Sequence, residues 1–138
     1  MSVTDQNCLS RRIQELASII NAPASLLPAV GTSNDFADPY ILIDGMFFQY
    51  VVRERGEILQ NRETRDVEKL LYWVFKGVTF NMAMEFERNH RMPGQDIRRL
   101  LFSHELQLLE TLNPQWRVME QQEIDEILLR APYSDQLG

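Results

Sequence analysis

Residues 66–91 read DVEKLLYWVFKGVTFNMAMEFERNHR, and the rest of the chain must fold around this segment. Its apolar residues recur at steps of three and four, which predicts one long helix with a broad apolar face. Thr64 or Asp66 can cap the first amides of this helix, and Pro93 ends it. We expect the charged side chains, Glu87 among them, to face the solvent. The helix is therefore the natural centre of a core.

The composition of the chain is that of a globular protein. The 138 residues are 44% hydrophobic and 25% charged, which predicts a single domain over residues 1–138. Cys8 is the only cysteine, so an internal disulfide and a cysteine-based zinc site are excluded. We see no secretory signal and no apolar stretch near the roughly 18 residues of a membrane span. We therefore expect a cytoplasmic protein without a membrane partner.

The charge of the chain is acidic and unevenly distributed. A formal net charge of -6 argues against nucleic acid as a partner, because phosphate binding needs clustered lysines and arginines. Residues 105–138 carry seven acids and two bases, whereas residues 1–104 are close to neutral. This asymmetry could attract a basic protein surface, although solvated acidic helices are common.

The first half of the chain predicts one helix and a small sheet. Residues 1–21 hold an amphipathic N-terminal helix, and an irregular connection follows it up to residue 39. Residues 40–60 predict a three-stranded antiparallel meander, because β-type runs flank the turn dipeptides Asp44-Gly45 and Arg55-Gly56. The polar residues 60–65 then form a loop.

The second half, residues 66–130, is predicted to be helical. After the long central helix, Asp96 can cap a helix that ends at Asn113-Pro114. Arg98 and Arg99 then lie outside, or they tie this helix to the sheet. We expect an extended piece over residues 116–119, a last helix over residues 120–130 with an acidic outer surface, and a loose tail over residues 133–138. The fold class is α+β: a small antiparallel three-stranded meander packed against about four helices in a single domain.

The sequence contains no assembled catalytic or metal-binding set. Glu87 and His90 have the Glu-x-x-His spacing of carboxylate-bridged metal sites, but a second copy of that motif is missing. A helix-end histidine beside a solvated glutamate explains the pair more simply. Ser103 and His104 are sequence neighbours, so on a helix they point about 100° apart and do not form a nucleophile–base pair. We therefore expect no enzyme activity, no metal and no cofactor.

Four stretches taken together resemble a known family. They are Tyr40–Ile43, Tyr50–Gly56 with its Glu-Arg-Gly turn, Leu70–Phe75, and Asp96–Phe102 with its Asp-x-Arg-Arg helix start. Over about residues 38–130 this order is similar to the small bacterial immunity proteins of polymorphic toxin systems, including contact-dependent growth inhibition. The resemblance implies an antitoxin that binds one cognate toxin domain in the cytosol and blocks its active site or substrate path.

The resemblance and the charge together suggest which toxin and which residues. Many toxins of such systems are nucleases with basic surfaces, so an acidic antitoxin fits a nuclease by charge complementarity. The mechanism would be occlusion, with acidic side chains standing where the nuclease holds phosphate and an apolar anchor slowing dissociation. The predicted contact residues are acids of the last helix and of the hairpin ends: Glu120, Glu123, Asp125, Glu126, Asp44 and Glu57.

Two alternatives remain open at the level of sequence. The broad apolar face of residues 66–91 could instead form a homodimer, which would make the chain an adaptor or an assembly subunit. The chain could also be a small enzyme in which Glu87 and His90 hold a metal.

Overall fold

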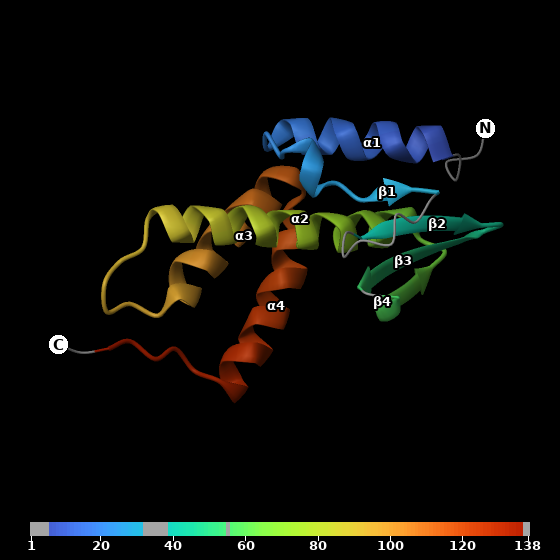
Figure 1. Ribbon diagram of the computed structural model, residues 1–138. Coiled ribbons are helices and arrows are strands. Elements are labelled where there is room, and N and C mark those ends of the chain that lie inside the picture. The colour runs from blue at the N-terminus through green and yellow to red at the C-terminus, as the bar shows by residue number, and fades with distance from the viewer. Residues whose placement is uncertain (1–5, 32–38, 55, 137–138) are drawn as a thin grey trace. The chain divides into compact units, whose positions relative to one another are not determined.

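The computed structural model describes residues 6–31, 39–54 and 56–136. Three predicted features therefore fall partly outside the described residues: the start of the N-terminal helix, the turn residue Arg55 and the last two residues of the tail. The described elements, in chain order, are helix α1 (Gln6–Ile19), the 3-10 helix η1 (Ala24–Leu26), strands β1 (Ala29–Val30), β2 (Tyr40–Asp44), β3 (Phe47–Glu54) and β4 (Glu57–Thr64), and helices α2 (Val67–Asn89), α3 (Ile97–Leu112) and α4 (Pro114–Arg130) (Figure 1).

The architecture is α+β, with a four-stranded mixed sheet and four α-helices, so the predicted fold class is confirmed. The chain groups into two compact units, residues 1–74 and residues 75–138. Helix α2 is continuous across this boundary and contributes residues 67–74 to the first unit. The single domain over residues 1–138 stays a prediction. No helix in the described part of the chain is long and apolar enough to cross a membrane.

The sheet has the strand order β1-β2-β3-β4. Strands β2, β3 and β4 form the predicted antiparallel meander, and β1 pairs in parallel with β2. The expectation of three strands was therefore wrong by one, because the segment predicted as an irregular connection contains β1. A strand of two residues is too short to show an alternation of apolar and polar side chains.

The first hairpin turn forms where the sequence predicted it, and the second strand pair extends further than predicted. Gly45 follows β2 with a φ of +60°, a conformation that glycine adopts without a Cβ clash. The predicted loop over residues 60–65 was wrong, because β4 continues to Thr64. Residues 60–64 pair in register with residues 48–52 of β3. Backbone pairing, not an apolar pattern, makes this polar segment a strand.

Helix α2 has the predicted start and the predicted buried face. The Asp66 carboxylate accepts a hydrogen bond from the amide of Glu68 at 2.9 Å, so Asp66 is the capping residue. The Thr64 hydroxyl accepts from the amide of Asp66 at 3.0 Å and thereby orients the cap. The buried apolar residues of this helix are Leu70, Leu71, Tyr72, Val74, Phe75, Val78 and Ala83. Phe80 and Met84 lie off this face and stay exposed.

Helix α4 begins earlier than predicted. The extended piece expected over residues 116–119 was wrong, because the helix starts at Pro114. The side chain of Asn113 accepts a hydrogen bond from the amide of Gln115 at 2.9 Å. Proline suits the first helical position because its missing N–H would have no helical partner there. Asn113 therefore caps the end of α3 and the start of α4, and Pro114 is the first residue of α4.

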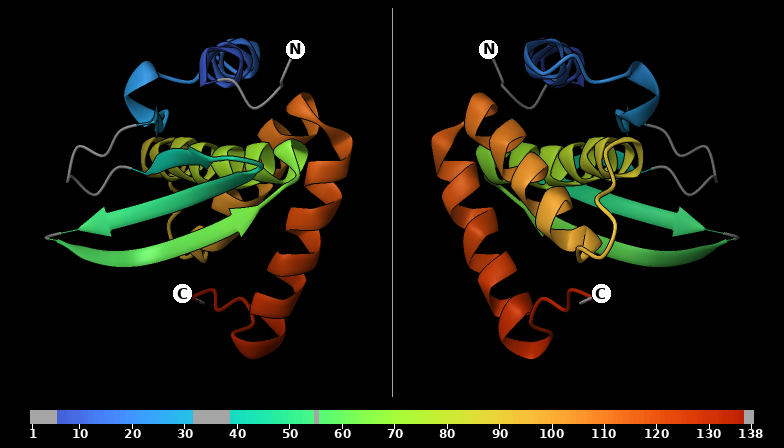
Figure 2. Two further views of the ribbon diagram at one scale, coloured as in Figure 1. Left: turned by 90° about the vertical axis from the view of Figure 1, so that its right-hand side faces the viewer. Right: turned by 90° about the vertical axis from the view of Figure 1, so that its left-hand side faces the viewer.

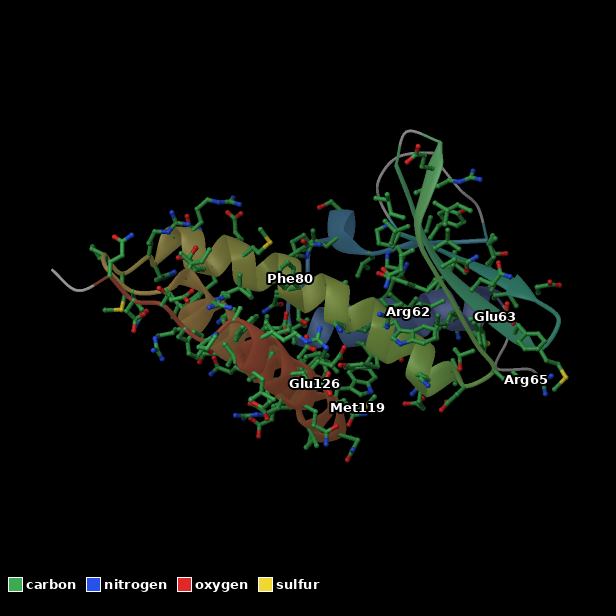
Figure 3. All side chains as sticks on the ribbon, turned by 90° about the horizontal axis from the view of Figure 1, so that it is seen from below. Arg62, Glu63, Arg65, Phe80, Met119 and Glu126 are labelled. Carbon is green, nitrogen blue, oxygen red and sulfur yellow. The ribbon has the colours of Figure 1, made fainter. Side chains whose placement is uncertain are left out.

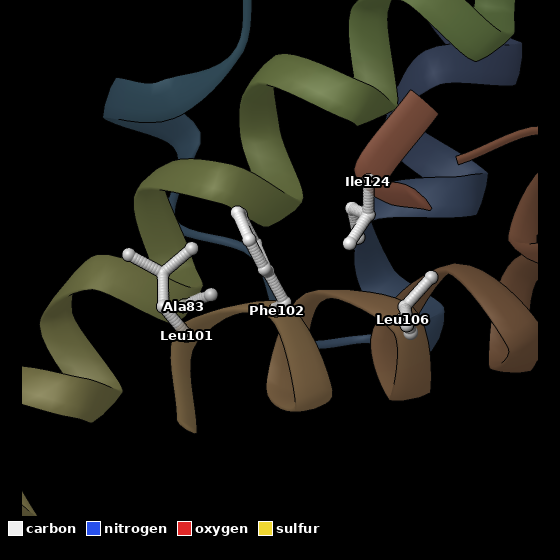
Figure 4. Packing of buried hydrophobic residues seen from close by; sticks show 5 residues of the cluster. All are labelled: Ala83, Leu101, Phe102, Leu106 and Ile124. Atoms are coloured by element: carbon white, nitrogen blue, oxygen red, sulfur yellow. The ribbon is translucent and has the colours of Figure 1, made fainter. Parts of the chain in front are cut away.

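The core of the second unit is a compact apolar cluster. Ala83 of α2, Leu101, Phe102 and Leu106 of α3, and Ile124 of α4 form its centre (Figure 4). Leu128 and Tyr133 pack against this centre. Because Tyr133 belongs to the segment after α4, the loose tail predicted from the sequence was wrong for residues 133–136.

Polar contacts fix the same segment. The Asp96 carboxylate accepts from the amide of Ser134 at 2.9 Å, and Arg98 donates to the carbonyls of Ala131 and Pro132 at 2.8 and 2.9 Å. Arg99 forms an ion pair with Asp135 at 3.0 Å. Arg98 and Arg99 therefore tie α3 to the C-terminal segment and not to the sheet; Arg99 lies outside, as one of the two alternatives predicted, and Arg98 is half-buried.

Candidate functional site

A pocket of about 250 Å³ lies in the second unit, between residues of α2, α3 and α4. Its lining combines charged and apolar side chains: Lys76, Phe80, Phe102, Glu105, Glu120, Glu123, Ile124, Glu126, Ile127 and Arg130. Four acids and two bases thus meet around a hollow that also has apolar walls. Figure 3 shows Phe80 on α2 and Glu126 on α4, seen from below.

The structure brings three of the six predicted contact residues together at this pocket. Glu120, Glu123 and Glu126 follow one another at steps of three along α4 and all line it. Asp125 does not line the pocket; it is exposed and accepts a hydrogen bond from Gln121 at 2.9 Å.

The other two predicted residues belong to the first unit. Asp44 is the last residue of β2 and Glu57 is the first residue of β4, and both side chains are exposed. Because the β2–β3 turn and the β3–β4 turn lie at opposite ends of β3, these two acids do not meet.

The acidic outer surface predicted for the last helix is wrong at Glu120. Only 4% of Glu120 is exposed, although it was predicted as a contact residue. Its carboxylate oxygen Oε1 lies 3.7 Å from Nζ of Lys76, and that ammonium lies 2.6 Å from Oε1 of Glu123. Lys76 therefore holds two of the predicted acids, one buried and one half-buried.

Glu105 of α3 completes this group and was not among the contact residues predicted from the sequence. Glu105 is 1% exposed, and burial, followed by a side-chain hydrogen bond to Glu120 and the charge of Glu120, raises its pKa to about 9. Glu105 is therefore protonated at neutral pH and donates a hydrogen bond to Glu120. Lys76 acts in the opposite direction and lowers this pKa.

A sequence signal for the two buried acids was present. The buried residues of α3 are Leu101, Phe102, Glu105, Leu106 and Leu109, so Glu105 occupies a core position of the helical period. On α4 the buried residues are Trp116, Glu120 and Ile124, at steps of four. An acid in the middle of an apolar stripe indicates a buried carboxyl group, not a solvated one.

The acids of α4 thus divide into two kinds. Glu105, Glu120 and Lys76 satisfy one another inside the unit, so they hold the three helices in place. Glu123 is half-buried, whereas Asp125 and Glu126 are exposed. The accessible acids are therefore Glu123, Asp125 and Glu126, and they can meet cations of another molecule.

The Glu-x-x-His pair has a structural role. Glu87 is 4% exposed, and its two oxygens accept hydrogen bonds from Arg91 at 3.0 and 2.8 Å. This pairing, above all the hydrogen bond from Arg91, lowers the pKa of Glu87. The expectation of a solvated Glu87 was wrong. The ring of His90 stacks on Phe86 with centroids 4.1 Å apart. Among the described residues, no group of three or more His, Cys, Asp and Glu is arranged to hold a metal ion.

Comparison with known protein families gives a match. The family model described as Immunity protein 63 matches residues 44–126, which is more than half of the chain. The match runs from the end of β2 into α4 and includes the whole of β3, β4, α2 and α3. No curated protein and no solved structure matches the chain significantly.

This match confirms the resemblance seen in the sequence. Immunity proteins belong to polymorphic toxin systems, where they neutralise a cognate toxin without being enzymes, so the expectation of a non-enzymatic antitoxin is confirmed. The chain is therefore a member of the Immunity protein 63 family.

Proposed function

We propose that the chain binds the toxic domain of its cognate toxin in the cytosol and blocks the active site of that domain by occlusion. We further propose that the toxin is a nuclease and that the pair belongs to contact-dependent growth inhibition or a related delivery system. The family match supports the binding of a toxin. The acids of α4 support the choice of a nuclease, because a nuclease must present cations to hold phosphate.

The accessible acids of α4 form the first proposed contact. Glu123, Asp125 and Glu126 lie within four residues, and no base lies among them. Such a local negative charge accelerates the encounter with a basic surface and favours it over neutral surfaces. Ile127 and Phe80 line the pocket beside these acids and are 45% and 40% exposed, so they can supply the apolar anchor.

Glu120 has a different role in this proposal. Its carboxylate is buried between Glu105 and Lys76. A partner cation would reach it only after displacing Lys76. We therefore assign Glu120 to holding α3 and α4 in place, and not to direct contact. Asp44 and Glu57 stay as proposed contacts at the two hairpin ends, where both are exposed.

The test measures binding of the cognate toxic domain. We expect a stoichiometric complex, rescue of growth when both chains are produced together, and inhibition of DNA or RNA cleavage by the purified chain. The triple variant Glu123→Gln, Asp125→Asn, Glu126→Gln should bind at least about tenfold more weakly at low salt. Most of this loss should lie in the association rate, because the removed charges act at long range.

A matched triple variant controls for net charge. Glu15→Gln, Glu85→Gln and Glu110→Gln remove three exposed acids from three other helices and change the charge by the same amount. We expect this variant to bind like the wild type. Equal losses in both triples would contradict the α4 contact. A toxic domain that cleaves no nucleic acid would contradict the choice of a nuclease while leaving the neutralisation of a toxin intact.

A further inference from the structure

Strand β4 forms an exposed edge of the sheet (Figure 2). Gln60 and Thr64 are half-buried, and the other six of its eight residues are exposed. Within the described residues, the main chain of β4 pairs with β3 and with no other element. Natural proteins usually shorten, cover or blunt such edges, because unpaired main-chain groups recruit another strand. We therefore expect this eight-residue edge strand to pair with another polypeptide.

The part of β4 that suits an added strand is residues 60–64. A register shift opposite Val52 and Arg53 leaves Leu59 as an extra, unpaired residue. This bulge interrupts the regular hydrogen bonding of β4 near its turn. Residues 60–64 pair one to one with β3. In an antiparallel ladder every second residue directs its N–H and C=O away from its partner strand. Residues 60–64 therefore present donors and acceptors at the spacing that an extended peptide requires.

Cations flank this edge, and Glu63 is an exposed acid within it. Arg62 lies over the ring of Trp73 at 5.6 Å, and Lys69 lies 6.0 Å from the same ring. Arg65 lies over the ring of Phe47 at 4.5 Å. Figure 3 shows Arg62 and Arg65 along this part of the chain. All three cations are exposed, and the aromatic rings restrict their side chains before any partner binds.

We infer that β4 receives an extended segment of the toxin, which adds one strand to the sheet and places acidic side chains against Arg62, Arg65 and Lys69. This inference rests on the proposed function, since it names a second contact with the same partner. Main-chain hydrogen bonds provide the affinity, and the three cations select the side chains of the added strand. Alternate residues of that strand lie on the same face as Arg62 and Lys69, so every second one should be acidic or polar.

A second copy of the chain is a poorer occupant of this edge. An antiparallel pairing of residues 60–64 with themselves places Arg62 directly opposite the Arg62 of the other copy. Like charges directly opposite each other destabilise a strand pair. A toxin strand with a carboxylate at that position replaces this repulsion with attraction.

Residue-resolved amide exchange, measured on the free chain and on its complex with the toxic domain, tests the added strand. We expect alternate amides of residues 60–64 to exchange fast in the free chain and at least about tenfold more slowly in the complex. A complex that forms without this protection overturns the β4 contact and leaves the proposed function standing. Failure to form any complex overturns both.

A pair of charge reversals tests the selection of acidic side chains. Arg62→Glu should weaken toxin binding at least about tenfold at low salt, whereas Arg62→Lys should bind within about threefold of the wild type. Arg11→Glu, a charge reversal at an exposed position of α1, should bind like the wild type. Arg65→Glu lies outside the strand and repeats the test should Arg62→Glu fail to fold. Binding by Arg62→Glu and Arg65→Glu that equals the Arg11→Glu control overturns the inference.

Discussion

Glu105 and Glu120 place two carboxyl groups where α3 and α4 otherwise bury hydrocarbon. A buried carboxylate is costly unless it is neutralised or paired. Here Glu105 stays neutral because it keeps its proton, which it donates in a hydrogen bond to Glu120. The charge of Glu120 is paired with the ammonium group of Lys76. Loss of the Glu105 proton would therefore leave two buried negative charges side by side in the second unit.

This arrangement makes stability depend on pH. The pKa of Glu105 is raised from 4.5 to about 9 in the folded chain, so the unfolded chain releases this proton at a lower pH than the folded chain does. The free energy of unfolding should therefore fall as the pH rises from about 5 to about 9. Glu105→Gln keeps a hydrogen-bond donor and has no proton to lose, so it should flatten this dependence. At pH 8 we expect it to raise the free energy of unfolding by roughly 1–3 kcal/mol.

Urea unfolding at several pH values measures the effect. Glu110→Gln on the same helix is the control, because Glu110 is exposed and pairs with Arg117 at the surface. Such a surface pair contributes about 0–1 kcal/mol, so this variant should keep the pH dependence of the wild type. A Glu105→Gln chain that is less stable than the wild type at pH 8 would show that Glu105 is ionised there.

At the scale of elements, local sequence patterns predict α2 and the first hairpin. Strand β1 and the second half of β4 depend instead on pairing with other strands. The period of residues 66–91 and the turn at Asp44-Gly45 lie within single segments, so one sequence is enough to see them. Strand β1 has two residues and exists through its pairing with β2. The second half of β4 is polar, so its pairing with β3 could not be seen as an alternation of side chains.

The candidate site follows the same division. Acidity along α4 was enough to predict Glu123 and Glu126, which line the pocket. The role of Lys76 could not be predicted, because it lies 47 positions before its partner Glu123 in the sequence. Glu105 could have been predicted from its place in an apolar stripe of α3. The exposed edge at Arg62 could not have been predicted, because the position of an edge depends on the strand order of the whole sheet.

The Asp-x-Arg-Arg start of α3 joins this helix to the C-terminal segment. Asp96 accepts hydrogen bonds from the amide and the side chain of Arg98 and from the amide of Ser134. These bonds, first of all the one from the Arg98 side chain, hold the pKa of Asp96 well below its usual range. The stability that they contribute is present at neutral pH and is lost as the pH falls below the usual value near 3.8.

Replacing one arginine of this motif should loosen the C-terminal segment. Arg98→Ala removes the side-chain donors to Asp96, Ala131 and Pro132, so we expect a lower melting temperature and faster exchange of the Ser134 amide. Arg88→Ala is the matched control, because Arg88 forms an exposed pair with Glu85 on α2. Equal melting temperatures for the two variants would mean that the side-chain contacts of Arg98 do not hold the segment.

Over the whole molecule, the proposed cationic contact beside β4 and the acidic contact on α4 belong to different units, whereas the proposed contacts Asp44 and Glu57 lie in the first unit. The cations beside β4 lie in the first unit, and the accessible acids of α4 lie in the second. Both sets are proposed to contact the same toxin. A toxin that presents a basic surface to one unit and an acidic strand to the other would satisfy both, whereas a uniformly basic protein would be attracted by one and repelled by the other.

The boundary between the two units falls between Val74 and Phe75, inside the continuous helix α2. Both residues are buried, at 1% and 0% exposure. Unfolding either unit alone would leave its part of α2 without apolar packing, and packing supplies most of the stability of a helix. We therefore expect residues 1–138 to unfold in a single cooperative transition, as the single-domain prediction requires.

The two tryptophans allow each unit to be followed separately. Trp73 lies in the first unit and Trp116 in the second, where its ring stacks on Phe75 at 6.1 Å. The single-tryptophan variants Trp73→Phe and Trp116→Phe each leave one fluorescent reporter. In each variant the fluorescence midpoint in urea should coincide with the circular dichroism midpoint of that same variant, because one transition moves both signals. A fluorescence midpoint that precedes the loss of helix in either variant would show that the units unfold independently, with α2 breaking near Val74.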